Sequence, residues 1–313
     1  MNSNKLFSRK AILPGLQMLL IVLFILPIAA IAIPSGFDVQ RPVYAFDFLT
    51  YKSGNGEETL LEIFCQIPTD DLIFIQFQDG FFASYDLKIR LFDTSGNEIV
   101  SQSLIDSVKV KSFKDIYLPR LPSLIRVALL IEPGEYEFRI RLTDMETLKD
   151  VRLQGNIEIP NYSKTDLQLS DLQLATSITA TDENNLLVKN QRKVIPNVPG
   201  IVGAELKHLF LYSEVYNLRY NAGEPHNEFV VTYIIKNEKG VEVKSIKRNY
   251  KKPGDSCVLS IGIPVAGLES GQYQLILDVE DPASAQAVRN FTNFYVTKPN
   301  PEPNLLSQLF TKR

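Results

Sequence analysis

Tryptophan is absent from the sequence, and histidine and cysteine occur only twice each among the 313 residues. A general base for nucleophilic catalysis would therefore have to be His208 or His226. Neither histidine lies near a recognisable nucleophile motif such as G-x-S-x-G. Two isolated cysteines, Cys65 and Cys257, are too few for a cysteine-based metal site. We therefore expect that the protein is not an enzyme and that it holds no metal.

Long basic runs are also lacking. The formal net charge is −3 at pH 7, and lysine and arginine are scattered along the chain. Because nucleic-acid binding needs clustered cations to neutralise phosphates, we expect no nucleic-acid partner. The sequence has no phosphate-cradling glycine loop and no zinc-ligand spacing, so we expect no cofactor.

The N-terminus carries a targeting signal. Three basic residues precede an apolar run over residues 11–33 that ends in "AIAIPSG". A positive flank, an apolar centre and small residues at the end are typical of a secretory signal peptide, so we expect residues 1–32 to be removed after Ala32. The run is nearly long enough to span a bilayer, and an uncleaved signal anchor is the alternative. Two prolines interrupt the run, which favours cleavage.

Later segments of the chain contain no second apolar stretch of spanning length. We therefore expect an exported protein, periplasmic or extracellular, without a membrane span after signal cleavage.

One segment occurs twice. "EPGEYEFRIRLTD" (132–144) is matched by "ESGQYQLILDVED" (269–281), and the offset of the two glycines is 271 − 134 = 137. The same offset aligns later pairs, including Val151 with Val288. A match over this many positions predicts two copies of one domain.

Each copy of this segment alternates apolar and polar residues, which predicts a half-buried β-strand. The Gly-x-Tyr entry resembles the tyrosine corner of immunoglobulin-type sandwiches, with Tyr136 and Tyr273 as the structural tyrosines. The core position two residues later holds Phe138 and Leu275 instead of cysteine. The architecture is therefore expected to be immunoglobulin-like without the antibody disulfide and its tryptophan.

Other segments support the same fold class. "ASYDLKIRLFDTSGNEIV" (83–100) and "FVVTYIIKNEKGVEV" (229–243) each predict a strand, a turn and a second strand. Upstream, "LEIFCQI" and "SEVYNLR" align Glu62 with Glu214. We predict an all-β protein of two tandem immunoglobulin-like antiparallel β-sandwich domains, residues 41–160 and 166–298, followed by a Pro-rich C-terminal tail, residues 299–313.

Two further expectations follow from this division. The two cysteines fall in different domains, so we expect two free, buried thiols. The second domain contains a polar excursion over residues 179–200 that is long for a connection, and we expect it to be mobile or to cover a sheet edge.

A set of short motifs in the chain resembles a known family. "RPVYAFDFLTY", "TLLEIFCQIPTDDLIF", "FASYDLKIRLFDTSG", "LSDLQLA", "IPN" and "LYSEVYNL" occur in this order. With the doubled Gly-x-Tyr strand, they resemble the N-terminal region of the GWxTD-domain proteins, exported bacterial proteins whose role is not established. The resemblance covers most of the mature chain. The Gly-Trp-x-Thr-Asp motif itself is absent, so nothing is carried over from that domain.

Several polar patterns fit turns better than sites. Asp70–Asp71 and Glu57–Glu58 are interpreted as solvated turn acids rather than a glycosidase pair. Asp93, Asn97 and Glu98 could bind calcium, but their spacing fits a hairpin turn. Asn161 and Asn290 begin N-glycosylation sequons that we interpret as coincidental.

Candidate partner contacts come from two apolar segments. Phe77, Phe81 and Phe82 lie in "IFIQFQDGFFASY" (73–85), where they form either core or an exposed binding surface. Leu309 and Phe310 lie in the tail, which either docks on its own domain or recruits a partner.

We therefore expect a non-enzymatic exported bacterial envelope protein that acts as a protein-interaction or scaffold module, with an unidentified envelope protein as its partner. The alternative is a carbohydrate-binding or hydrolase-accessory sandwich with a glycan ligand. The absence of tryptophan counts against this alternative, and 13 tyrosines keep it open.

Overall fold

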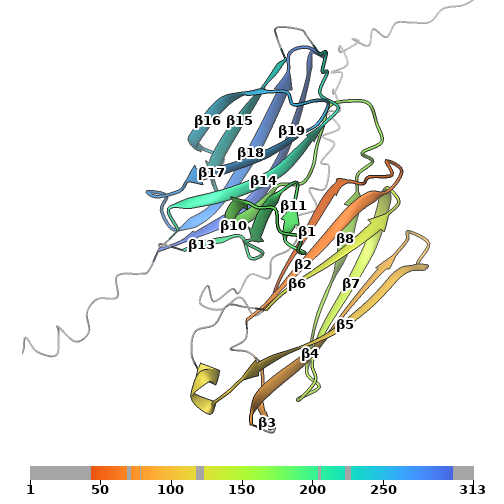
Figure 1. Ribbon diagram of the computed structural model, residues 1–313, viewed down its shortest axis with the longest axis vertical. Helices are drawn as coiled ribbons and strands as arrows, with labels where there is room; N and C mark the ends of the chain where they lie inside the picture. Colours follow the sequence, from red (N-terminus) through yellow and green to blue (C-terminus); the bar gives the residue numbers. More distant parts are fainter. Residues whose placement is uncertain are drawn as a thin grey trace, which may run out of the picture. The chain divides into compact units, whose positions relative to one another are not determined.

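The computed structural model describes residues 44–68, 72–77, 79–117, 123–203, 206–222 and 227–298. Within these ranges the chain is all-β, with strands β1 to β19 and one short 3-10 helix. The predicted fold class of two tandem immunoglobulin-like antiparallel β-sandwiches is confirmed (Figure 1). The predicted signal peptide and C-terminal tail lie outside the described residues. Among the residues that are described, no helix has the length and apolar character to cross a membrane.

The first sandwich contains β1 to β8. Its smaller sheet has the strand order β1 (Ala45–Lys52), β2 (Thr59–Ile67) and β6 (Ser123–Ile131). Its larger sheet has the order β3 (Ile75–Phe77), β4 (Gly80–Phe92), β7 (Gly134–Asp144) and β8 (Asp150–Ile159). The long strand β5 (Glu98–Val110) pairs with the opposite edge of β4, and the 3-10 helix η2 (Phe113–Tyr117) follows it.

Alternation along β2 and β4 builds the core of this sandwich. Residues at every second position of each strand are buried and pack together, as the pattern predicted; on β4 they are Ala83, Tyr85, Leu87, Ile89 and Leu91, and on β2 they are Leu61, Ile63, Cys65 and Ile67. Because successive strand residues point to opposite faces, the intervening Glu62 and Phe64 point away from this core. Both are nevertheless buried, which shows that another element covers the outer face of β2.

The second sandwich has its own two sheets. One has the order β11 (Val188–Lys189), β12 (Arg192–Pro196), β10 (Gln173–Ala180), β14 (His208–Tyr216) and β17 (Cys257–Pro264), with β9 (Gln168–Leu169) beside the end of β14. The other has the order β13 (Ile201–Gly203), β19 (Gln286–Thr297), β18 (Gly271–Asp281), β15 (Glu228–Asn237) and β16 (Glu242–Lys251). A separate cluster of buried apolar residues fills the space between them.

The strand pairing reproduces the repeat seen in the sequence. Gly134 on β7 lies opposite Ile159 on β8, and Gly271 on β18 lies opposite Val296 on β19. Both pairs are related by the same offset, because 271 − 134 = 137 and 296 − 159 = 137. The hydroxyl of Tyr136 donates to the carbonyl of Glu132 at 2.9 Å, and that of Tyr273 donates to the carbonyl of Glu269 at 3.0 Å.

The aspartates that end the repeated segment also have a common role. Asp144 Oδ1 accepts the backbone N–H of Glu146, and Asp281 Oδ1 accepts that of Ala283. An aspartate that bonds the N–H two residues later fixes a tight turn. The second copy adds a fully buried ion pair, in which Lys252 Nζ lies 2.6 Å from Asp281 Oδ1. Burial alone would raise the pKa of Asp281, but the hydrogen bond from Lys252 and the N–H of Arg219 hold it below its usual value.

The polar excursion of the second copy is a hairpin. Its strand β12 pairs with β10 in antiparallel register, and β11 pairs with β12. The excursion therefore covers the edge of β10, which was one of the two expected outcomes.

Both cysteines are free, one in each sandwich. Cys65 is buried in the first core, and this burial raises the pKa of its thiol to about 12. Cys257 is only partly buried, so the expectation of two buried thiols is wrong for this residue. The reason is its place at the first position of β17, opposite Val215 near the end of β14, where the sheet stops covering it.

Candidate functional site

An exposed apolar surface lies at one end of the first sandwich, where β3, the start of β4 and η2 meet (Figure 1). We call it the apolar tip and define it by six residues: Ile73, Ile75, Phe77, Phe81, Phe82 and Phe113. Phe77 is 59% exposed and Phe113 is 58% exposed, and both isoleucines are exposed as well. An exposed group of large apolar side chains on one surface marks an interaction site more often than scattered ones do.

The strand register explains why these side chains gather. β3 pairs with the first three residues of β4, with Ile75 opposite Phe82, beyond the point where β7 begins to pair at Tyr85. Opposite residues share a face, so Ile75, Phe77 and Phe82 lie on the outer face of the sheet. The rings of Phe77 and Phe82 contact each other edge to face, with their centroids 5.5 Å apart.

Phe81 lies on the inner face of the same hairpin, where it meets an aromatic ring of η2. Phe81 packs against Phe113 of η2, with ring centroids 5.8 Å apart. Gly80 allows β4 to begin here, because a Cβ at this position would lie 2.6 Å from the carbonyl oxygen of Val110. The tip is thus a strand hairpin fixed against the end of β5, with aromatic rings on both faces.

The predicted partner-contact residues differ in how exposed they are to solvent. Phe77 is exposed, whereas Phe81 and Phe82 are half-buried within the tip. Leu309 and Phe310 lie outside the described residues. The sequence prediction missed Phe113, which joins the tip from a helix about 30 residues further along the chain.

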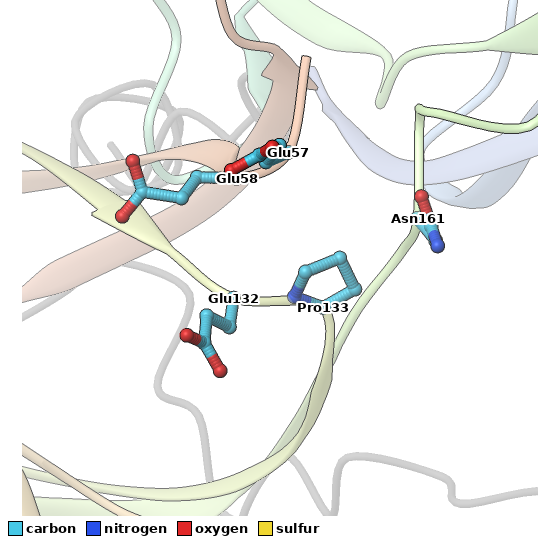
Figure 2. Close-up of a pocket in the computed structure, with 5 residues that line it drawn as sticks. All are labelled: Glu57, Glu58, Glu132, Pro133 and Asn161. Carbon is cyan, nitrogen blue, oxygen red and sulfur yellow. The ribbon is translucent and has the colours of Figure 1, made fainter. Parts of the chain in front are cut away.

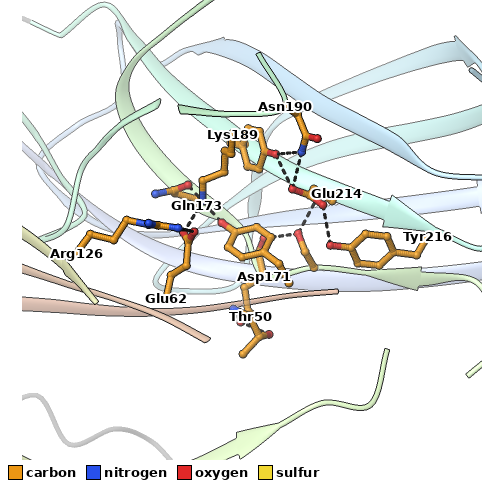
Figure 3. Close-up of polar contacts among 12 residues, drawn as sticks. Thr50, Glu62, Arg126, Asp171, Gln173, Lys189, Asn190, Glu214 and Tyr216 are labelled. Carbon is orange, nitrogen blue, oxygen red and sulfur yellow. Dashed lines mark hydrogen bonds and ion pairs between the residues drawn. The ribbon is translucent and has the colours of Figure 1, made fainter. Parts of the chain in front are cut away.

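A second candidate is a polar cluster where the two sandwiches contact each other (Figure 3). Glu62 projects from the outer face of β2 and accepts hydrogen bonds from Arg126 Nε at 3.1 Å and Nη2 at 2.5 Å. Its other carboxylate oxygen lies 2.5 Å from Lys189 Nζ, which comes from the hairpin of the second sandwich. Both sandwiches belong to one compact unit of the chain, and this ion pair joins them.

Aromatic rings surround the ammonium group of Lys189. Its Nζ lies 4.1 Å from the ring centroid of Tyr51, 5.2 Å from that of Tyr212 and 5.9 Å from that of Phe64. Cations are attracted to the faces of aromatic rings within about 6 Å. Burial lowers the pKa of Lys189, and the negative charge of Glu62 acts in the opposite direction. The ammonium group is therefore held by a carboxylate and three rings, which suits a structural link.

Glu214, the residue that the sequence aligned with Glu62, lies in the same cluster. It accepts hydrogen bonds from the hydroxyls of Tyr212 at 2.5 Å and Tyr216 at 2.9 Å, and from Asn190 Nδ2 at 2.9 Å (Figure 3). Apolar residues complete the contact: Leu49, Tyr51 and Phe64 of the first sandwich pack with Ala175, Val194, Val198 and Tyr212 of the second. The two aligned glutamates thus both organise the contact between the two sandwiches, which we call the joint.

The pKa values of two further carboxylates at this joint are raised. Asp171 Oδ2 accepts hydrogen bonds from the backbone N–H of Thr50 at 2.8 Å and from its hydroxyl at 2.7 Å. Burial and the nearby charge of Asp171 raise the pKa of Asp47 to about 7, although the Phe48 N–H and Lys189 oppose this shift. Burial also raises the pKa of Asp171.

The first sandwich also carries an open, acidic depression of about 510 Å³ (Figure 2). Glu57, Glu58, Glu132, Pro133 and Asn161 line it. Glu58 accepts a hydrogen bond from Asn55 Nδ2 at 2.7 Å, and Asn161 Oδ1 accepts the backbone N–H of Ser163 at 2.8 Å. These bonds fix turns, and the described residues that line the hollow include no aromatic ring on which a sugar could stack.

The remaining sequence candidates do not assemble into a site. His208 is exposed on β14 beside Phe210, and His226 and the Asp70–Asp71 pair lie outside the described residues. Asp93 accepts hydrogen bonds from the side chain and N–H of Asn97 and from the N–H of Ser95; these bonds lower its pKa and fix the β4–β5 turn. Within the described ranges, no group of three His, Cys, Asp or Glu residues is placed to hold a metal ion.

Comparison with protein-family models gave no match to this chain, and comparison with curated proteins gave none either. The function is therefore argued from the geometry of the molecule.

Proposed function

We propose that this protein is a non-enzymatic, exported interaction module that binds a partner protein through the apolar tip. The observation that carries the proposal is the exposure of Phe77 and Phe113, each more than half exposed, on one end of a rigid sandwich. Aromatic residues are enriched among the side chains that dominate protein–protein binding. The basic, apolar N-terminal segment supports export, and the ordered motifs support a relationship to the N-terminal region of GWxTD-domain proteins.

Rigidity of the tip favours protein binding. Phe77 and Phe82 are held on paired strands, and Phe81 is held against η2. A surface whose side chains are already ordered loses less conformational entropy when it binds.

A glycan ligand has less support. A sugar site of the kind expected from the sequence needs a polar cleft walled by tyrosines. Of the described residues that line the acidic depression in Figure 2, none is aromatic. Seven tyrosines of the described residues are instead buried in the cores and at the joint: Tyr51, Tyr85, Tyr162, Tyr212, Tyr216, Tyr233 and Tyr273.

Co-purification from native envelopes tests the proposal. The tagged full-length protein is crosslinked mildly in cells of its host and recovered, and the bound proteins are identified by mass spectrometry. The test variant is Phe77→Ser with Phe113→Ser. The matched control is Phe291→Ser, because Phe291 is 55% exposed on β19 of the second sandwich. Substitutions at exposed positions are expected to change stability by only about 0.5 kcal/mol.

We expect a reproducible partner with the wild type and with Phe291→Ser, and loss of at least about nine-tenths of it with the double variant, since anchor aromatics contribute about 2 kcal/mol or more. Recovery of the same partner in equal amount with the double variant would overturn the tip as the binding surface. Recovery of the protein alone in every case would overturn the proposal of a stable partner.

A further inference from the structure

The strand β5 is an open sheet edge. It runs for 13 residues and, among the described residues, pairs with β4 alone. It forms the outer strand of the larger sheet of the first sandwich (Figure 1). A strand with one antiparallel neighbour leaves every second pair of backbone N–H and C=O groups without a ladder partner, and such an edge can pair with another strand.

The second copy provides an internal comparison. Val100 on β5 lies opposite Leu91, and Lys244 on β16 lies opposite Ile235. The two pairs are related by one offset, since 235 − 91 = 144 and 244 − 100 = 144, so β16 is the counterpart of β5.

Charge distinguishes these two edges. By the same offset, Ser103, Leu104 and Ser107 of β5 correspond to Lys247, Arg248 and Lys251 of β16. Lysines and other charges on an edge strand are a common protection against edge-to-edge pairing. The edge of β16 carries this protection, whereas β5 has no charged residue from Ile99 to Ile105.

Exposed apolar side chains lie at the centre of the unprotected edge. Leu104 is 37% exposed on the inner face of the sheet, and Ile105 is 69% exposed on the outer face. We propose that two copies of the chain join their β5 strands in antiparallel register about a twofold axis at Leu104, so that the larger sheets form one continuous sheet.

The sequence of β5 is complementary to itself in this register. Full overlap of residues 98–110 places Leu104 opposite its own copy and Val100 opposite Val108, with Ser101 opposite Ser107 and Gln102 opposite Asp106. No two like charges are opposite, and the two Ile105 side chains become diagonal neighbours on the outer face.

Other registers fit less well. A one-residue slip of one strand would place core-facing residues of one copy opposite outward-facing residues of the other. An axis at Ser103 shortens the overlap and places Asp106 opposite Val100. An axis at Ile105 also shortens it and places Asp106 opposite Leu104. An axis at Asp106 would place two carboxylates opposite each other. Closed twofold pairing through one shared patch is the commonest way in which identical chains associate.

A disulfide at the axis tests both the dimer and its register. Leu104→Cys is made in the purified full chain with Cys257→Ser, which removes the more accessible native thiol. Residues directly opposite in an antiparallel pair have Cα atoms about 4.5–5.5 Å apart, within the range that a disulfide can span. Ser101→Cys in the same background is the control, because its copy lies six residues away along the paired strand.

Both variants are oxidised mildly and compared by non-reducing electrophoresis. We expect Leu104→Cys to give a disulfide-linked dimer and Ser101→Cys to remain monomeric. Equal crosslinking of the two variants, or none with Leu104→Cys, would overturn the proposed pairing.

A second test exchanges residues between the edge strands β5 and β16. We expect the fold to tolerate the exchange, because β16 already carries at the corresponding positions the residues that are introduced into β5. The first variant carries three substitutions on β5: Ser103→Lys, Leu104→Arg and Ser107→Lys. We expect its dimer dissociation constant, measured by sedimentation, to rise at least about tenfold, because two arginines meet at the axis. Lys247→Ser with Arg248→Leu and Lys251→Ser should leave the β5 dimer intact. An unchanged dissociation constant in the first variant, or a crosslinker at residue 105 that captures a different protein instead of a second copy, would contradict the proposal.

Discussion

The ammonium group of Lys189 in the second sandwich lies 2.5 Å from the carboxylate of Glu62 in the first. Lys189 is placed there by the β11–β12 hairpin, the excursion within the second copy. Glu62 lies on the outer face of β2 and is buried, so its charge needs the two cations that reach it. The joint between the sandwiches therefore rests on a feature that distinguishes the two copies.

Lys189→Met should destabilise the protein by about 2 kcal/mol, because one cation is lost from a buried carboxylate that keeps only Arg126. Unfolding in denaturant, followed by circular dichroism, measures the change. Lys193→Met is the control on the same hairpin, since Lys193 pairs with the exposed Glu183 and should contribute about 0.5 kcal/mol or less. Equal effects of the two substitutions would contradict the proposed link.

Stability should fall as the pH rises through the titration of Asp47. Its pKa is raised to about 7 in the native state, and an unfolded aspartate titrates near pH ~3.9. Between these values the native chain holds a proton that the unfolded chain has lost, so the free energy of unfolding decreases with rising pH in this window.

Asp47→Asn should remove the contribution of Asp47 to this dependence and leave that of Asp171, whose pKa is also raised. The variant should be more stable than the wild type by up to ~4 kcal/mol at pH 8 and nearly equal to it at pH 4. Thermal unfolding across this range measures the difference, with Asp182→Asn as an exposed control. A constant difference between Asp47→Asn and wild type at every pH would show that the titration has been assigned to the wrong group.

The buried pair of Lys252 and Asp281 should contribute far more than an exposed pair. Lys252→Met leaves a fully buried carboxylate without its cation, and we expect a loss of about 3–5 kcal/mol. Arg289→Met breaks the exposed pair with Asp278 on the same sheet and should cost far less, because water screens the two charges. Denaturant unfolding compares the two; similar losses would mean that solvent reaches Lys252.

The two tyrosine corners should differ in strength. Tyr273→Phe removes a hydroxyl that donates to Glu269 from a buried position and should cost about 1 kcal/mol. Tyr136→Phe removes the matching bond to Glu132, which is exposed although the Tyr136 ring is half-buried, and should cost less because water replaces the lost partner. A larger loss for Tyr136→Phe than for Tyr273→Phe in the same unfolding assay would reverse this ranking.

Local pattern accounts for the parts of the fold that the sequence predicted. The alternation from Ala83 to Leu91 is a property of one strand packed on one core, and it needs no knowledge of distant residues. The repeat extends this prediction to the second copy. There the alternating residues Phe229, Val231, Tyr233 and Ile235 are buried in the same way.

The joint and the complete tip depended on contacts that no local pattern contains. Glu62 meets Lys189 across 127 positions of the chain, and Phe81 meets Phe113 through the placement of η2 after β5. One signal was present: "LEIFCQI" sets a glutamate in a mostly apolar strand, which indicates a covered outer face with a cation nearby. The identity of that cation required the structure.

Photo-crosslinking from the apolar tip is the sharpest test of binding through this surface. A photoreactive phenylalanine analogue is placed at position 77 or at the equally exposed position 291 of the full-length protein, and intact host cells are irradiated. We expect a discrete crosslinked product with one envelope protein from position 77 and none from position 291. No product from position 77, or the same product from both positions, would contradict binding through the tip.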